Sequence, residues 1–400
     1  MKDISKPIKR SIPKKADLNF TIDEDDNLSE TTDESATTDL NTKLKPIKNR
    51  NFKLTKKQLI VGLIILAVVV IGLIYFFVFR EHGQNSVTSI KNTSTSKKTT
   101  TASPISPLTG MPVTLAKTKL PVTGIMIENS DEARPQSGLS QAGVVFEALA
   151  EGGITRFLAL FQEGQPSSIG PIRSARPYFI DWALGFDAAY VHVGGSPDAL
   201  SQIKTDNVKD INQFYYGNYF TRITSREAPH NVYTSISSLH GLETTLDYDK
   251  SNFTGFPRKK DQPDKTPNAT NIAFNIASPD YKVNYTYDKP LNSYKRSEGG
   301  SPMIDANTNK QLEPKVVIAI VVPLSQGALD ASGAYYSDYS DIGSGSAYIF
   351  QDGTLTKSIW TKDSPTSQIT FTDIAGNAIK LNAGQTWITA LSSSNLVAYQ

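Results

Sequence analysis

Three arginines in a loop-rich stretch, residues 147–177, have the residue type and spacing for anion recognition. Arg156, Arg173 and Arg176 occur there beside paired glycines and a proline-bounded turn. Arginine stays charged at physiological pH, and its planar guanidinium matches the geometry of a carboxylate or phosphate. Other arginines lie in or beside loops of the same part of the chain, namely Arg134, Arg222 and Arg226. If several converge, they form a ligand site.

The alternative is that each arginine pairs with a nearby acid and stabilises a loop. Glu151, Asp181 and Glu227 are close enough in sequence to serve as such partners. Residue types alone leave both interpretations open, because an ion pair and an anion site use the same guanidinium.

Glu147 and Glu151 suggest acid–base chemistry. They lie in SQAGVVFEALAEGG, whose spacing predicts a helix capped by Ser140 and ended by Gly152. Two carboxylates on one helix face could act as general acid and base. An acid–base pair requires surroundings that separate the two pKa values, which close neighbours on one face do not provide. Helix-surface or arginine-pairing glutamates are therefore the competing interpretation.

Two histidines offer a hydrolytic alternative. His192 ends a predicted strand and His230 lies in a later loop, while Ser196 and Asp198 follow His192 closely. These residues could form a Ser/His/Asp set, and the histidines with a carboxylate could hold zinc. The sequence contains no Gly-x-Ser-x-Gly, His-Glu-x-x-His, P-loop or dinucleotide-binding motif. No metal or cofactor is therefore predicted.

The elements that position these side chains fall into two predicted domains. The first, residues 107–247, alternates strands with helices and is predicted to be α/β. Its strands are expected at 122–127, 156–161 and 188–193, and a further helix at 197–203. A Lys/Pro/Asp-rich linker, 248–267, leads to a mostly antiparallel β domain, 268–400, in which 316–322 is a central strand.

The first hundred residues indicate where in the cell the protein is located. Residues 1–58 are polar and charged and are predicted to be a disordered cytoplasmic tail, with an acidic patch that could dock a partner. Residues 59–79 contain no charge and are long enough for one transmembrane helix. A cleaved signal peptide would have a shorter apolar core nearer the terminus. The basic flank precedes the helix, which places residues 80–400 outside, beginning with a Ser/Thr/Lys-rich stalk, 80–106.

Composition narrows the classes of partner. The net charge of +2 gives no reason to expect nucleic acid. Cysteine is absent, which excludes disulfides, thiolate metal sites and a lipid-attachment cysteine.

Several long runs resemble the YerB-like family of bacterial envelope lipoproteins over about residues 105–400. The matching runs are PLTGMP, ARPQSGLSQAGVVFEALAEGGITRFLALF, IGPIRSARPYFIDWA, VHVGGSP, REAPHNVYTS, YIFQDG, WTKDSPTSQITF and LNAGQTWI. The resemblance implies an extracytoplasmic protein with two domains, and it implies no particular reaction. Such proteins are typically anchored by a lipidated cysteine, whose place the predicted transmembrane helix takes here.

We therefore expect a single-pass membrane protein with a binding or regulatory ectodomain in the cell envelope. Its expected ligand is an anionic wall component or a membrane partner, engaged by the arginine region. A hydrolase using His192 or His230 with a Glu or Ser, and a structural ectodomain of a membrane complex, are the alternatives.

Overall fold

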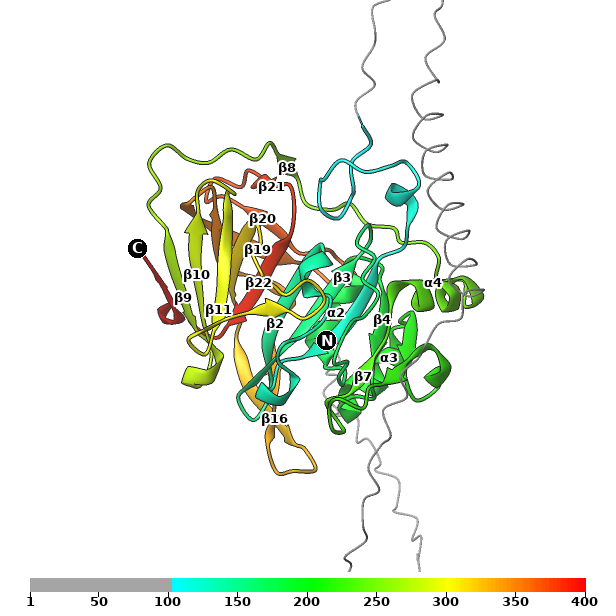
Figure 1. The fold of residues 1–400 in the computed structure, drawn as a ribbon. Helices are drawn as coiled ribbons and strands as arrows, with labels where there is room; N and C mark the ends of the chain where they lie inside the picture. Colours follow the sequence, from blue (N-terminus) through cyan, green and yellow to red (C-terminus); the bar gives the residue numbers. More distant parts are fainter. Residues whose placement is uncertain (1–102) are drawn as a thin grey trace, which may run out of the picture. The chain divides into compact units, whose positions relative to one another are not determined.

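A mixed sheet of 12 strands runs through both halves of the chain in the computed structural model, which describes residues 103–400 (Figure 1). Its order is β20-β19-β18-β15-β22-β2-β3-β1-β4-β5, and the hairpin β16–β17 joins it at β2. At the centre, β2 (Val144–Glu151) pairs in parallel with β22 (Thr386–Leu391). β15 (Val316–Val321) pairs in parallel with the other edge of β22. Backbone hydrogen bonds therefore join the two halves.

The remaining elements flank this centre. The other strands of the large sheet are β1 (Thr123–Glu128), β3 (Ile154–Phe161), β4 (Ala189–His192), β5 (Asp210–Asn212), β16 (Leu324–Leu329), β17 (Tyr335–Tyr339), β18 (Gly343–Gln351), β19 (Thr354–Lys362) and β20 (Thr370–Thr372). A second sheet contains β12 (Ser301–Pro302), β11 (Ser293–Glu298), β10 (Lys282–Asp288), β9 (Asn271–Asn275) and β23 (Val397–Tyr399). Three short pairs are β6 (Thr221–Arg222) with β7 (Val232–Tyr233), β8 (Arg258–Lys259) with β21 (Leu381–Asn382), and β13 (Ile304–Asp305) with β14 (Lys310–Gln311).

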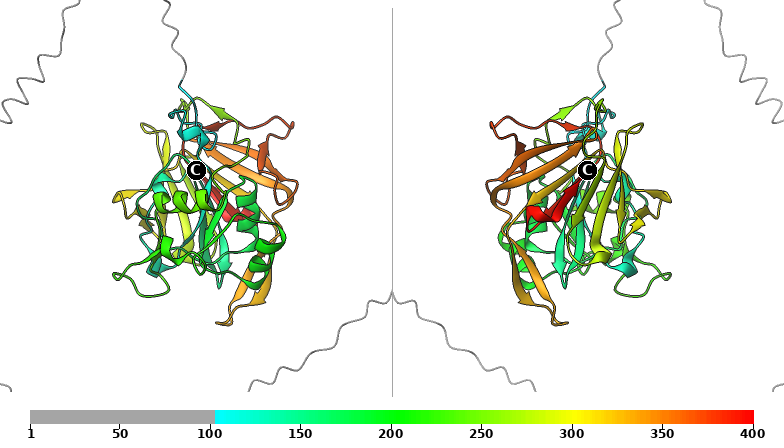
Figure 2. Two further views of the ribbon diagram at one scale, coloured as in Figure 1. Left: turned by 90° about the vertical axis from the view of Figure 1, so that its right-hand side faces the viewer. Right: turned by 90° about the vertical axis from the view of Figure 1, so that its left-hand side faces the viewer.

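Both faces of the large sheet are covered. On one face, α2 (Pro177–Leu184) contributes Tyr178, Phe179 and Trp182 to an apolar core. On the other face, α4 (Ile236–Thr245) packs against β1 and β3, and the second sheet packs against β15 and β18. α3 (Pro197–Thr205) lies beside α2, and Figure 2 shows the hairpin β16–β17 extending beyond the rest. Strands covered on both faces need apolar residues at successive positions, which explains their unbroken apolar runs.

The predicted α/β character of the first half is only partly right. Strands at 122–127, 156–161, 188–193 and 316–322 and the helix at 197–203 are confirmed by β1, β3, β4, β15 and α3. The helix predicted across 140–151 is wrong, because this segment forms β2. Successive residues of this strand face the two cores in turn, so apolar residues occur on both faces. The segment therefore lacks the apolar–polar alternation of a half-exposed strand, and its apolar positions also fit helical spacing. The described chain is mostly β, with mixed sheets and few helices.

Several predictions concern residues outside the described range. The cytoplasmic tail at 1–58, the transmembrane helix at 59–79 and most of the stalk at 80–106 belong to this part of the chain. From residue 103 onward, the structure contains no helix with the length and apolarity needed to cross a membrane. Near the predicted end of the stalk, Ser106 is buried and donates a hydrogen bond to Glu163 at 2.9 Å.

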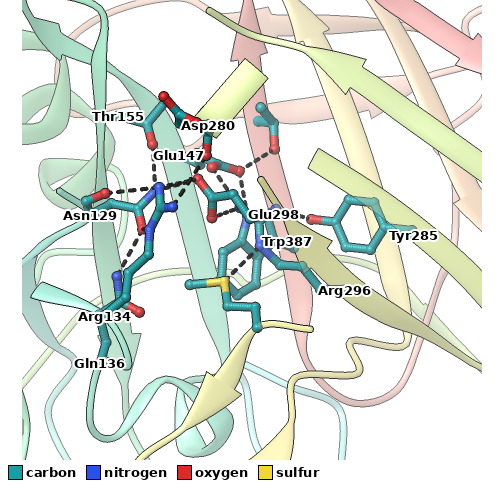
Figure 3. A network of polar contacts seen from close by, with 12 residues as sticks. Asn129, Arg134, Gln136, Glu147, Thr155, Asp280, Tyr285, Arg296, Glu298 and Trp387 are labelled. Carbon is teal, nitrogen blue, oxygen red and sulfur yellow. Dashed lines mark hydrogen bonds and ion pairs between the residues drawn. The ribbon is translucent and has the colours of Figure 1, made fainter. Parts of the chain in front are cut away.

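A fully buried guanidinium links the second sheet to the large one (Figure 3). Arg296 of β11 donates to Glu147 Oε1 of β2 at 2.7 Å and to Glu298 Oε2 at 3.1 Å. It also donates to Tyr285 Oη at 2.7 Å, and its guanidinium lies 4.4 Å from the Trp387 ring centre. The indole of Trp387 completes the arrangement by donating to Glu147 Oε2 at 3.0 Å. One arginine therefore connects strands from both sheets.

The network continues into the loop after β1. Asn129 Nδ2 donates to Glu298 Oε1 at 2.6 Å and to Thr155 Oγ1 at 2.6 Å. Arg134 donates to the same Glu298 oxygen at 3.1 Å, and Gln136 Nε2 donates to Asn129 Oδ1 at 2.8 Å. Moving a charged group out of water is costly unless protein groups replace the hydrogen bonds that water made. In this network, side chains from distant segments supply the replacement hydrogen bonds.

Replacing Arg296 with methionine should destabilise the fold by about 3–5 kcal/mol, because Glu147 would stay buried without its cation and Glu298 would keep only Arg134. Denaturant unfolding would measure the loss. The matched control is Lys295→Ala on the same strand, where the lysine is exposed and pairs with Asp288. A variant at Arg296 as stable as this control would contradict the role given to the network.

A second buried charge lies where α4 meets β1. Thr123 Oγ1 donates to Glu243 Oε1 at 2.5 Å, whereas Oε2 has no hydrogen-bond partner within residues 103–400. His240 Nε2 lies 3.8 Å from Oε2. Burial raises the pKa of Glu243 to about 7, and the hydrogen bond from Thr123 opposes the rise. The folded protein therefore keeps the carboxyl group of Glu243 protonated at pH values where the unfolded chain releases that proton.

The pH dependence of stability should show this difference. The contribution of Glu243 is retained below about pH 4.5 and is lost as the pH rises towards 7, by about 3 kcal/mol in total. Glu243→Gln should remove this loss, so that the variant gains stability relative to the wild type between pH 5 and about 8. Unfolding at a series of pH values, with the exposed Glu313→Gln as control, tests it. Parallel curves for the wild type and Glu243→Gln would contradict the assignment.

Candidate functional site

The carboxylate of Glu128 collects three side chains from separate segments where β1 ends. Its Oε1 lies 2.9 Å from Arg173 Nε, 3.0 Å from His230 Nδ1 and 3.1 Å from Ser130 Oγ. The side chain of Glu128 is only 4% exposed, and its Oε2 has no hydrogen-bond partner in the described part of the chain. We call Glu128, Ser130, Arg173 and His230 the Glu128 centre.

Backbone hydrogen bonds fix the positions of Arg173 and His230 in the Glu128 centre. The amide of Arg173 donates to Met126 O at 3.0 Å, which holds its segment against β1. His230 lies in the loop between β6 and β7, and its amide donates to Glu227 O at 2.9 Å. His230 Nδ1 has hydrogen-bond geometry to Glu128, whereas Arg173 Nε is an ion-pair contact of Glu128 that lacks this geometry. Within residues 103–400, the Nη groups of Arg173 and Nε2 of His230 have no hydrogen-bond partner.

A pocket of about 620 Å³ opens beside this centre. It is lined by Glu132, Ser225, Arg226, Glu227, Ala228 and His230. Arg226 is held in place, because its guanidinium donates to the backbone oxygens of Glu132 and Pro135. Glu132 is exposed, so solvent and salt screen its charge more than that of a buried group. We call this cavity the His230 pocket.

Two of the three predicted arginines meet on one carboxylate. Arg156 contacts Glu151 Oε1 at 2.5 Å and Arg176 contacts Glu151 Oε2. Both arginines are buried, and Arg176 lies 4.7 Å from the ring centre of Tyr336. Burial acts to raise the pKa of Glu151, but the two guanidiniums outweigh it and hold the pKa below its ordinary value. Here the arginines are paired with a local acid, whereas Arg173 belongs to the Glu128 centre.

The other predicted binding arginines are also engaged within the fold. Arg134 contacts Asp131 and Glu298 and donates to both oxygens of Asn129 and to Asp280 O. Arg222 is exposed and donates to Asn231 at 2.8 Å. Every donor direction of Arg134 is thus directed to a residue of the protein.

His192 and Ser196 have structural contacts. His192 is fully buried, with Nδ1 2.6 Å from Gly194 O and Nε2 2.7 Å from Asp210. Ser196 caps α3 by accepting from the amide of Ala199. Both ring nitrogens of His192 are thereby occupied, and the hydroxyl of Ser196 serves the helix terminus.

The predicted acid–base pair does not share a helix face. Glu147 is buried in the network around Arg296, and Glu151 binds Arg156 and Arg176. From residue 103 onward, no group of three His, Asp or Glu side chains is arranged to hold a metal ion.

Glu128 and Ser130 were not predicted as site residues. Glu128 directly follows the strand predicted at 122–127, and with Ser130 it belongs to a loop rich in turn-forming residues. An acid at a strand end before such a loop is a weak signal of a site. Arg173 and His230, whose contacts make Glu128 a candidate site residue, lie 45 or more residues away in the sequence. No local pattern therefore identifies Glu128 as a site residue.

Glu151→Gln should destabilise the protein at pH 7 by about 2–3 kcal/mol, because two buried guanidiniums would lose their counter-charge. The pKa of Glu151 is lowered in the folded state, so its contribution is present above about pH 4.5 and is lost as the pH falls further. The difference from wild type should therefore shrink in acid. Unfolding curves at pH 7 and 3.5, with the exposed Glu313→Gln as control, test this prediction; a difference that grows in acid would contradict it.

Comparison with known proteins identifies the family. Family models described as the N-terminal and C-terminal domains of "Protein of unknown function (DUF3048)" match residues 108–249 and 272–388. The "Putative lipoprotein YerB" of Bacillus subtilis (strain 168) is 35% identical over 262 residues, which cover 64% of this chain and 77% of that protein. The crystal structure of YerB from Bacillus subtilis aligns with a TM-score of 0.66 and 30% identity, covering 74% of this chain and 99% of that one. The chain thus belongs to the YerB-like DUF3048 family of proteins of unknown function.

Proposed function

We propose that this protein is a membrane-tethered binding module of the bacterial cell envelope that recognises an anionic group through the Glu128 centre. The observation behind this proposal is that Arg173 and His230 share one buried carboxylate while their outer nitrogens have no partner within residues 103–400. Donors held by a fixed acid lose little freedom when a ligand binds. A phosphate or carboxylate suits the guanidinium donors of Arg173, and His230 Nε2 adds a further donor when both ring nitrogens are protonated.

The envelope location is supported by two observations. The family relative is named a putative lipoprotein, which fits an extracytoplasmic protein attached to a membrane. Residues 59–79 of this chain form an uncharged stretch long enough to span a bilayer, preceded by basic residues. The proposed topology is a single pass with the N-terminus in the cytoplasm and residues 80–400 outside. Phosphate-bearing and carboxylate-bearing wall polymers are available to an ectodomain there.

Glu128 serves as the positioning residue in this arrangement. Its Oε1 contacts both Arg173 and His230, so one carboxylate orients both side chains. The acids Glu132 and Glu227 also line the His230 pocket, and their charges oppose an anion placed close to them. Arg156, Arg176 and Arg134 stabilise the surrounding fold, because their guanidiniums are paired inside it.

A hydrolase is the second candidate, favoured by the contact between His230 and Glu128. An imidazole oriented by a carboxylate through Nδ1 has Nε2 available as a general base for water. Ser130 is unsuited as the nucleophile of such a set, because its hydroxyl lies on the Nδ1 side, 3.5 Å from that nitrogen. The hydrolase proposal therefore rests on water attack and not on a Ser/His/acid triad.

Titration of the full-length protein with poly(glycerol phosphate) should show saturable binding that weakens with added salt. Arg173→Ala should weaken it roughly tenfold to a hundredfold, since one charge-assisted hydrogen bond contributes about 1.5–3 kcal/mol. His230→Ala should weaken it less than Arg173→Ala. The matched control is Arg222→Ala, an exposed arginine that contacts Asn231. Calorimetry measures all four proteins.

The competing functions give different outcomes in the same samples. Mass spectrometry that finds cleaved polymer, lost in His230→Ala, would support the hydrolase. Unchanged affinity in both variants would remove the Glu128 centre as the binding site. No binding of poly(glycerol phosphate) or of a carboxylate polymer would contradict the proposal and favour a structural ectodomain of a membrane complex.

A further inference from the structure

An aromatic loop follows β5 and exposes two rings to solvent. Residues 213–220 read QFYYGNYF, so five of eight residues are aromatic. The side chains of Phe214 and Tyr215 are 68% and 73% exposed, whereas Tyr216, Tyr219 and Phe220 pack against the core beneath α4. We call the loop the aromatic platform. Exposed rings are not needed for that core, so their position calls for another explanation.

The backbone of the platform is firmly held by one buried residue, Asn212. Its side-chain oxygen accepts from the amides of Gly194 and Phe214, each at 3.2 Å. Its backbone oxygen accepts from Tyr215 at 2.9 Å and from Tyr216 at 3.1 Å. Rings presented by a fixed backbone lose less conformational entropy on binding than rings on a mobile segment.

The exposed ring of Phe214 lies directly over Gly194. A Cβ added at Gly194 would come within 3.0 Å of the ring carbon Cε2, and the glycine has a φ of +59°. Only a residue without a side chain allows this close approach in that backbone conformation. One side of the Phe214 ring therefore packs against the main chain at Gly194, and the rest of the ring is exposed to solvent.

The polar groups around the rings are neutral. No residue from 211 to 221 carries a charge, and the platform has the amides of Gln213 and Asn218. Gln213 Oε1 is buried and accepts no hydrogen bond from the described residues. Exposed aromatic faces with nearby amides and no charge suit a ligand that has apolar faces and hydroxyl edges, which is the chemistry of a neutral pyranose ring.

The size of the exposed surface also favours a small ligand. An aromatic side chain buries roughly 150–250 Å² when it is covered completely, so two rings offer at most about 300–500 Å². A stable protein–protein contact buries about 800 Å² on each partner. A membrane surface would favour several basic residues beside the rings, whereas residues 211–221 contain none and Arg222 is the single arginine that follows directly.

We propose that the aromatic platform is a binding site for neutral sugar rings, formed by stacking on Phe214 and Tyr215 with hydrogen bonds to Gln213 and Asn218. This site is separate from the anion site at the Glu128 centre and uses none of its residues. The sugar could belong to an amino-sugar polymer or to a hexose polymer, since both present the same apolar ring faces.

Calorimetric titration of the full-length protein with an N-acetylglucosamine oligomer and with a glucose oligomer distinguishes these sources. Binding of at least one is expected. Phe214→Ala and Tyr215→Ala should each weaken that binding roughly tenfold, which corresponds to about 1.4 kcal/mol of stacking. Tyr335→Ala is the matched control, because this tyrosine is half exposed on the hairpin strand β17.

Further variants separate the proposal from misfolding and from the proposed anion site. Tyr215→Phe keeps the ring and should keep the affinity, and Arg173→Ala should leave sugar binding unchanged. Both alanine variants should still bind poly(glycerol phosphate) as the wild type does, if that activity is present. Failure of both oligomers to bind, or equal binding by the wild type and the two alanine variants, would overturn the sugar site.

Two other outcomes would assign the platform elsewhere and also overturn the proposal. The first is self-association of the wild type in sedimentation that Phe214→Ala abolishes, which would make the platform a contact between copies. The second is binding to phosphatidylglycerol vesicles that depends on these rings, which would make it a membrane contact.

Discussion

The structure depends on the neutralisation of Glu147 by Arg296 in a place that water does not reach. Glu147 lies on the central strand β2, and Arg296 belongs to the second sheet. Removing both charges from water is expensive, so the pair is favourable only with its full set of hydrogen bonds. Tyr285, Trp387 and Glu298 complete that set. Apolar contacts alone would tolerate small shifts between the sheets, whereas these directional bonds allow one alignment.

The alignment of the sheets extends to the Glu128 centre through the next residue in the chain. Asn129 binds Glu298 in the network, and the neighbouring residues Glu128 and Ser130 belong to the centre. Gln136 spans both by donating to Glu128 O at 3.0 Å and to Asn129 Oδ1. The position of Arg173 and His230 is therefore linked to the packing of the second sheet, although neither residue contacts that sheet in the described hydrogen bonds and ion pairs.

The sequence was sufficient for elements with a local cause. Apolar runs bounded by turn residues predicted β1, β3, β4 and β15, and the Ser196–Pro197 start predicted α3. The segment 140–151 was mistaken for a helix, because burial on both faces removes the alternation that marks a strand. The partners of buried polar side chains cannot be predicted from the sequence. Glu147 meets Arg296 across 149 residues and Trp387 across 240, and no local pattern specifies such pairs. For the same reason, Arg173 and His230 were recognised as candidates, but Glu128, which joins them, was not.

The parallel pairing of β2 with β22 constrains how the protein can be made. The edge of β2 opposite β3 pairs with β17 at Glu151, but its stretch from Val144 to Glu147 pairs with β22, residues 386–391. During synthesis, more than two hundred residues follow β2 before β22 is available to cover this stretch, and an open apolar strand edge promotes aggregation. Pairing over such a sequence distance also slows folding. The newly synthesised chain therefore needs protection of β2, either by a chaperone or by temporary contacts within its own first half.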